Sequence, residues 1–159
     1  MSDSHDAWHN LETAVRIATE RGCEHILHAG DFISPTGLEV LKDFPGKIHI
    51  VWGNNEGEKV GFIKMLAALP RITHRGDVME ETIGGLRFYM NHYPGIAENA
   101  ALTGKYDVVV FGHTHEYHDE TKPNGTLLVN PGDVQGLRTG VASMIVFDTV
   151  TKIAERITL

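Results

Sequence analysis

Residues 25–31 have the sequence His-Ile-Leu-His-Ala-Gly-Asp, a short apolar stretch that runs into a Gly-Asp turn. Its length and its ending predict a β-strand over residues 25–29. Before this strand, apolar residues recur at the spacing of one helix face, and Gly22 is placed to end that helix. The residues of this face are Trp8, Leu11, Val15 and Ala18. A helix that leads directly into a strand is typical of an α/β protein.

Helix and strand continue to alternate along the first half of the chain. Residues 35–41 are expected to form a short helix with a proline at its start, and residues 47–52 form a strand that stops at Gly53. Residues 60–69 form the next expected helix, which ends ahead of Pro70. This order is that of βαβ units, in which consecutive strands run parallel.

The second half of the chain favours antiparallel strands. The dipeptides Gly84-Gly85 and Asn124-Gly125 predict hairpin turns between runs of apolar residues. The expected elements here are a helix over 96–102 and strands over 77–83, 86–91, 106–111, 127–129, 141–147 and 152–159. We therefore expect an α/β fold, a sandwich of two mixed β-sheets with helices outside.

The chain begins with Met1-Ser2-Asp3, so almost nothing precedes the first expected helix. A βαβ unit should start with a strand, and we therefore expect the first strand to be truncated in this sequence. No internal repeat, low-complexity tract or linker divides the chain. Residues 1–159 are accordingly expected to form a single domain.

Composition narrows the class of protein. The chain has 42% hydrophobic and 22% charged residues, as globular proteins do, and no apolar run long enough to span a membrane. A single cysteine, Cys23, excludes an internal disulfide and suits a cytoplasmic location. The formal net charge of −7, with no basic patch, argues against nucleic-acid or membrane partners. Ten histidines in so short a chain reflect either chance enrichment on the surface or a set of metal ligands.

Polar side chains with ligand chemistry come directly after several of the expected strands. They are Asp31, Asn54, Asn55, His92, His113 and His115, together with Asp3 and His5 at the start of the chain. Sites in open α/β sheets form at the carboxyl ends of strands, so these segments are expected to converge at one edge.

Their spacing suits metal binding. Residues two apart on an extended chain point to the same side, so Asp3 and His5 can share a metal, and so can His113 and His115. The carboxylate of Asp31 has two oxygens and can bridge two cations. Imidazole and carboxylate together suit Zn, Mn or Fe. Two divalent cations would leave a local excess of about two positive charges, which attracts phosphate even to an acidic protein.

Each of these residues has an alternative interpretation when taken alone. Gly30-Asp31 and Gly53-Asn54-Asn55 are also common turn sequences, and His92 alone is more typical of a surface or core histidine. The other histidines are expected to be structural: His9, His25, His28, His49, His74 and His118. Ligand chemistry after several strands at once is harder to attribute to chance.

Taken in order, Asp-x-His, Gly-Asp, Gly-Asn, His and Gly-His-Thr-His resemble the signature of the calcineurin-like metallophosphoesterases. Asn130-Pro131-Gly132 and the short length resemble the small bacterial and archaeal phosphodiesterase branch. The resemblance implies a four-layer fold of two β-sheets flanked by helices. It also implies hydrolysis of a small-molecule phosphate ester by a hydroxide that bridges two divalent ions, with manganese as our first expectation and Zn, Fe, Ni or Mg as alternatives.

The resemblance assigns roles to residues. The first metal would be held by Asp3, His5, Asp31 and His115, and the second by Asp31, Asn54, His92 and His113. Asp31, Asn54, Asn55 and His92 would take part in catalysis. Many family members have a histidine at the place of Asn55, where it assists the leaving group. Asparagine can donate a hydrogen bond to phosphate but cannot serve as a general acid, so slower turnover of poor leaving groups is expected.

Two other functions remain as hypotheses. One is a non-catalytic metal-binding scaffold on the same fold, which the change at Asn55 and the short start keep open. The other is a different metal hydrolase with a His-x-His pair, but barrel enzymes of that kind need roughly 250 residues. Pairing of two copies of the chain in a homodimer is a further hypothesis.

Overall fold

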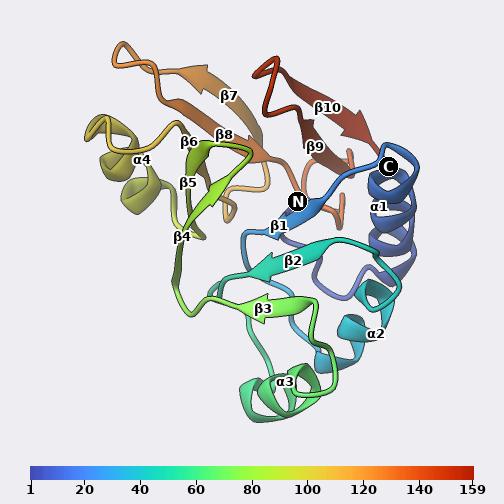
Figure 1. Cartoon of the computed structure of the whole chain (residues 1–159). Coiled ribbons are helices and arrows are strands. Elements are labelled where there is room, and N and C mark those ends of the chain that lie inside the picture. The colour runs from blue at the N-terminus through green and yellow to red at the C-terminus, as the bar shows by residue number, and fades with distance from the viewer.

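The computed structural model describes residues 1–159 and places ten strands and four α-helices along the chain (Figure 1). The helices are α1 (Trp8–Glu20), α2 (Leu38–Leu41), α3 (Lys59–Leu66) and α4 (Pro94–Leu102), with a 3₁₀ turn, η1, at Pro35–Gly37. The strands are β1 (His25–His28), β2 (Lys47–Ile50), β3 (Ile72–His74), β4 (Val78–Ile83), β5 (Leu86–Asn91), β6 (Val108–Val110), β7 (Tyr117–Thr121), β8 (Leu127–Pro131), β9 (Ser143–Phe147) and β10 (Ala154–Thr158).

The strands form three sheets. A parallel sheet has the order β1-β2-β3, a mixed sheet has the order β4-β5-β6-β8-β7, and β9 and β10 form an antiparallel pair. The α/β class is confirmed, but the expectation of two mixed sheets was wrong. The reason is that no strand pairs with both β1 and β9, so the parallel sheet and the β9–β10 pair stay separate.

Three hydrophobic clusters fill the spaces between layers. The first lies between the β1–β3 sheet and helices α1 to α3, and it includes Leu11, Ile48 and Phe62. The second lies between the parallel and the mixed sheet, where Val51 meets Met90 and Val110. The third lies under α4, on the outer face of the mixed sheet. Figure 1 shows the two sheets side by side, with α1 and α2 on one flank and α4 on the other.

Residues 1–3 connect the two halves of the molecule. The amino group of Met1 donates to the Leu27 carbonyl at 2.9 Å, and the Asp3 amide donates to the Gly30 carbonyl at 3.0 Å. On the other side, the Val134 amide donates to the Ser2 carbonyl at 3.0 Å. Beyond this short bridge, the space between β1 and β9 is a largely apolar cavity of about 410 Å³. The expected first strand is therefore represented here by three residues.

Most other elements lie where the sequence predicts them. Both hairpins turn as expected, because Gly84, Gly85 and Gly125 have positive φ angles of 56°, 82° and 89°. Strand β3 was missed, since three residues are too few to show a period of two. None of the helices combines the length and the apolar character needed to cross a membrane.

We expect the free energy of unfolding to increase as pH rises from about 4 to 6.5. Burial lowers the pKa of His74 and of His49 from 6.5 to about 4, and that of His28 to about 3. The folded state thus binds fewer protons than the unfolded state in this window, and stability rises with pH by at most about 1.4 kcal/mol per pH unit for each histidine. His5, whose pKa is raised by its contact with Asp3, acts in the opposite direction.

Urea unfolding of metal-free protein at pH 4.5, 5.5 and 6.5 measures this trend. His74→Phe should reduce the increase of the unfolding free energy with pH. In the folded protein the centroids of the His74 and Trp52 rings lie 3.6 Å apart, and His74 Nδ1 accepts from the Gly76 amide, so this nitrogen cannot carry a proton. His9→Asn, at an exposed position of α1, is the control. An unfolding free energy that stays flat or falls across the range would contradict the expectation.

Gly112→Ala should destabilise the protein by about 1–3 kcal/mol. A Cβ at Gly112 would collide with Ser2 Oγ and with Asp3 Oδ2, so the short bridge of residues 1–3 must shift. The matched control is Gly95→Ala in α4, where a Cβ meets no atom within 4 Å and alanine favours the helix. Urea denaturation of both variants is the test, and equal stability of the two would show that the bridge is not tightly packed.

Candidate metal centre

The candidate ligands lie in the turns that follow strands. Asp31 follows β1, Asn54 follows β2 and His92 follows β5. His113 and His115 follow β6. Asp3 is the last residue of the bridge formed by residues 1–3, and His5 comes two residues after it. The structure brings all seven side chains together, although they come from both halves of the molecule.

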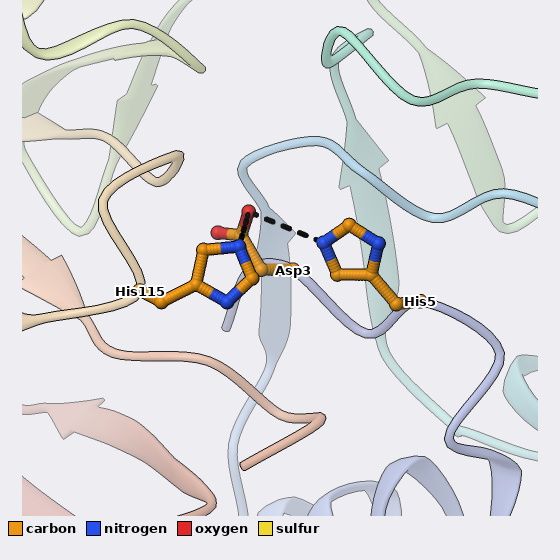
Figure 2. Close-up of side chains that lie close together, drawn as sticks. All are labelled: Asp3, His5 and His115. Atoms are coloured by element: carbon orange, nitrogen blue, oxygen red, sulfur yellow. Dashed lines mark ion pairs between the residues drawn. The ribbon is translucent and has the colours of Figure 1, made fainter. Parts of the chain in front are cut away.

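Asp3, His5 and His115 form the first group, shown in Figure 2. Asp3 Oδ1 lies 3.8 Å from His5 Nε2 and 3.5 Å from His115 Nε2. The two imidazole rings are stacked with their centroids 5.1 Å apart. Asp3 Oδ1 and His5 Nε2 are both buried and have no hydrogen-bond partner. Buried polar atoms that point at one another without a hydrogen bond fit a site for a cation.

Asp31 links this group to a second one. Its Oδ2 lies 3.4 Å from His5 Nε2, and its Oδ1 lies 3.4 Å from His92 Nε2. Asn54 Oδ1 lies 2.9 Å from His92 Nε2 and 2.7 Å from His113 Nδ1. Asp31 thus faces both groups, as a bridging carboxylate would.

The Nδ1 protons of His92 and His115 point away from the centre, toward oxygen acceptors. His92 Nδ1 lies 2.7 Å from the Ala29 carbonyl, which can only accept, so the neutral ring presents a lone pair at Nε2. His115 Nδ1 likewise lies 2.9 Å from a carboxylate, that of Asp133. Lone pairs of nitrogen therefore face carboxylate and amide oxygens, an arrangement that repels itself unless a cation is bound.

Electrostatics at the centre favour ionised carboxylate. Burial works to raise the pKa of Asp3, but contacts with His5 and Ser2 and the nearby His92 and His115 bring it below its usual value. The same contact with Asp3 raises the pKa of His5. Protonation of His5 would therefore compete with a cation for the same nitrogen.

The backbone at the centre is strained. Eight residues other than glycine have positive φ angles, and five of them are candidate ligands: Asp3, His5, Asp31, His113 and His115. Such conformations cost on the order of 1 kcal/mol each and persist where surrounding contacts impose them. Gly30, with φ 99°, allows the β1 turn to approach Gly53 and His92, where a Cβ would collide.

Asn55 lies on Asp31 in this structure. Its backbone amide donates to Asp31 Oδ1 at 2.8 Å and its Nδ2 donates to Oδ2 at 2.7 Å. The side chain therefore orients the carboxylate of Asp31. A hydrogen bond to phosphate, as the resemblance implies, would require it to turn away.

Glu56 was not predicted to have a role. Its carboxylate accepts from the amides of Gly53, Phe32 and Ile33 at 2.9, 3.3 and 3.1 Å, which ties the turns after β1 and β2 together. Its position beside two candidate ligands in the sequence was the only available signal.

The six histidines that were expected to be structural stay outside the centre. His28 is buried between Ser4 and Phe32, and His25 stacks on His49. Cys23 packs at the edge of the first hydrophobic cluster. None of these is within the two groups that could hold a metal ion.

The Asn130-Pro131-Gly132 segment braces the histidine turn. Asn130 Nδ2 donates to the Gly112 carbonyl at 2.9 Å and to Thr114 Oγ1 at 3.0 Å. Asp133, the next residue along the chain, was missed as a site residue. The signal was present, because it follows β8, which runs parallel to β6 and ends at the same edge.

Comparison with known proteins agrees with the geometry. Residues 1–152 match the family model described as the calcineurin-like phosphoesterase superfamily domain. The chain is 32% identical over 154 residues, 96% of its length and 92% of the relative, to Phosphodiesterase MJ0936 of Methanocaldococcus jannaschii.

Two solved structures are similar to this chain. One, described as a novel archaeal phosphodiesterase, has a TM-score of 0.93 at 31% identity and covers all of this chain and 97% of its own. The phosphoesterase YfcE of E. coli shares the fold, with a TM-score of 0.68 at 18% identity over 98% of this chain and 95% of its own. The chain belongs to the calcineurin-like phosphoesterase superfamily.

Proposed function

We propose that this protein is a phosphodiesterase that uses two divalent metal ions to hydrolyse a small phosphate ester. The observation that carries the proposal is the convergence of lone pairs from both halves of the molecule around Asp31. Similarity to an archaeal phosphodiesterase over 96% of the chain supports the reaction class.

The distances support the two ligand sets that the resemblance implies. Asp3, His5 and His115, with Asp31 Oδ2, would hold the first ion, and Asn54, His92 and His113, with Asp31 Oδ1, would hold the second. The buried, unpartnered Asp3 Oδ1 and His5 Nε2 fit this assignment. Nitrogen and oxygen ligands without thiolate suit Mn²⁺, our first expectation, as well as Zn²⁺, Fe²⁺ and Ni²⁺.

A pair of divalent cations, when bound, supplies Lewis acidity toward phosphate and brings the pKa of water near neutrality. The carboxylates of Asp3 and Asp31 would neutralise about two of the four positive charges. The remaining charge would attract an anionic ester to an otherwise acidic protein.

The exposed end of the centre is the side that a substrate can approach. Asn54 and Asn55 are exposed and His113 is half-buried, whereas Asp3, Asp31, His92 and His115 are buried. The substrate would therefore lie against Asn54 and His113. Asn55 can donate a hydrogen bond there but has no proton to give to a leaving group.

The scaffold hypothesis is less well supported. A scaffold that no longer binds metal for catalysis would be expected to have lost some of the metal ligands, and all seven ligand positions are present in this chain. A scaffold role would still have to explain why five candidate ligands keep strained backbone conformations.

Asp31→Asn should abolish metal-dependent hydrolysis. Loss of an outer partner of a metal ligand already costs about 10–100-fold, so loss of a bridging ligand should lower kcat/KM at least about 100-fold. The measurement is release of p-nitrophenol from bis-p-nitrophenyl phosphate and p-nitrophenyl phosphate by stripped protein to which Mn²⁺, Ni²⁺, Zn²⁺ or Mg²⁺ is returned.

Three outcomes separate the hypotheses. Metal-dependent activity that favours the diester and disappears in the variant supports a phosphodiesterase. Binding of two ions by folded protein without hydrolysis of either ester would support the scaffold instead. Failure of the folded protein to bind any of the ions would overturn the proposal.

Asn55→His should raise turnover of esters with poor leaving groups more than that of p-nitrophenyl esters. A histidine at this place could donate a proton, a contribution of up to about 100-fold for an alkoxide but little for p-nitrophenolate. The ratio of kcat for a methyl phosphodiester to kcat for bis-p-nitrophenyl phosphate isolates proton donation, because loss of the Asn55–Asp31 contact affects both substrates alike.

Asn55→Gln, which has no titratable group, is the matched control and should leave the ratio unchanged. A ratio that is the same in Asn55→His and in the parent protein would show that position 55 does not reach the leaving group.

A further inference from the structure

Asp133 is a fully buried carboxylate with no basic side chain against it. Its relative exposure is 0%, and it forms no ion pair with lysine or arginine. Besides His115, its one side-chain partner is the Thr139 hydroxyl, which donates to Oδ1 at 3.3 Å. A buried carboxylate is costly unless its charge is compensated, so the compensation has to come through His115.

The geometry places His115 between two carboxylates. Its Nδ1 lies 2.9 Å from Asp133 Oδ2, and its Nε2 lies 3.5 Å from Asp3 Oδ1. A carboxylate accepts, so the imidazole proton lies on Nδ1, toward Asp133. The Nε2 lone pair then points at the first metal group. Such a carboxylate–histidine pair fixes the ring and makes the free nitrogen a better ligand.

The backbone holds Asp133 rigidly in this place. Its carbonyl accepts from the Ser143 amide at 2.9 Å, and the following residue, Val134, donates to the Ser2 carbonyl at 3.0 Å. Gln135 donates to the carbonyl of Asp3 at 3.2 Å. The segment that carries Asp133 is thus hydrogen-bonded to the bridge that carries Asp3, so both sides of His115 are fixed by one network.

The second metal group has no equivalent of Asp133. His92 Nδ1 donates to a backbone carbonyl, that of Ala29, which is a weaker partner than a carboxylate. His113 directs its Nδ1 toward Asn54 and is half-buried. The two groups therefore differ in the support behind their histidines.

We propose that Asp133 is a positioning residue that holds His115 as an Nε2 ligand and makes the Asp3–His5–His115 site the tighter of the two metal sites. This inference rests on the proposed two-metal function. It predicts that metal loads in two resolved steps, with the first ion at Asp3, His5 and His115. The carboxylate would also offset one more positive charge behind this site, which makes its net charge lower than that of the other.

The test is Asp133→Asn, which preserves the shape of the side chain and removes its charge. The amide can donate to His115 Nδ1, which would move the imidazole proton to Nε2 and block the ligand atom. Titration calorimetry of stripped protein with Mn²⁺ should show that the tighter site is weakened about 10–100-fold, while the weaker site changes little. Long-range ¹H–¹⁵N correlation spectra of the metal-free protein should show that His115 changes from the Nδ1–H to the Nε2–H tautomer.

Thr139→Val is the matched control, since it removes the other side-chain hydrogen bond to Asp133 and does not touch His115. It should leave the tautomer and both affinities unchanged. His115→Ala and the double variant His115→Ala/Asp133→Asn complete a cycle. If Asp133 acts through His115, the second change should cost no further metal affinity.

The outcomes are distinguishable from failure of the proposed function. If the parent protein binds two Mn²⁺ ions and Asp133→Asn weakens neither, or weakens both equally, the inference is overturned and the metal centre stands. The inference is also overturned if His115 keeps its Nδ1 proton in Asp133→Asn. If the parent protein binds no metal, the proposed function itself fails.

Discussion

The structure depends on the way residues 1–3 are hydrogen-bonded on both sides. One side is hydrogen-bonded to residues 27–30 at the end of β1, and the other is hydrogen-bonded to Val134 and Gln135 after β8. The parallel sheet and the mixed sheet contribute different ligands, so neither forms a metal site alone. The bridge places Asp3 between them, and the absence of a side chain at Gly112 lets it approach the turn after β6. Three residues thus set the relation between ligands that are more than 100 positions apart.

The candidate metal centre has several features that lower the stability of the folded state in the absence of a ligand. Several buried acceptors converge there, two polar atoms have no partner, and five candidate ligands have positive φ angles. A chain selected for stability alone would place apolar residues or ion pairs at this position. The hydrogen-bond networks of Glu56 and of Asn130 hold the strained turns from behind. The strain is therefore imposed by the surrounding structure, and a bound cation would relieve the electrostatic part of it.

Sequence alone predicted the helices, the hairpins and the set of residues that meet at the centre, because periodicity and turn chemistry act locally. It did not predict that β1 and β9 belong to separate sheets, since the pairing of strands depends on contacts far apart in the chain. Asn55 was expected at the phosphate and lies on Asp31, because the turn after β2 folds its amide back onto that carboxylate. Asp133 was missed because one carboxylate after a proline-glycine turn is ordinary. Its place after β8 was a signal in the sequence, and its burial behind His115 is what distinguishes it from an ordinary turn residue.

The charge of the molecule constrains the order in which ligands can bind. The chain carries a formal net charge of −7, which includes the three buried carboxylates of Asp3, Asp31 and Asp133 at or behind the centre. Without cations, an anionic ester would meet a negative potential both at a distance and in the site. Once two divalent ions are bound, the local sign reverses while the surface remains acidic. In the proposed two-metal function, metal binding would then precede substrate binding, and attraction of the ester would be short-ranged because salt screens charges beyond roughly one Debye length, about 8 Å at physiological salt.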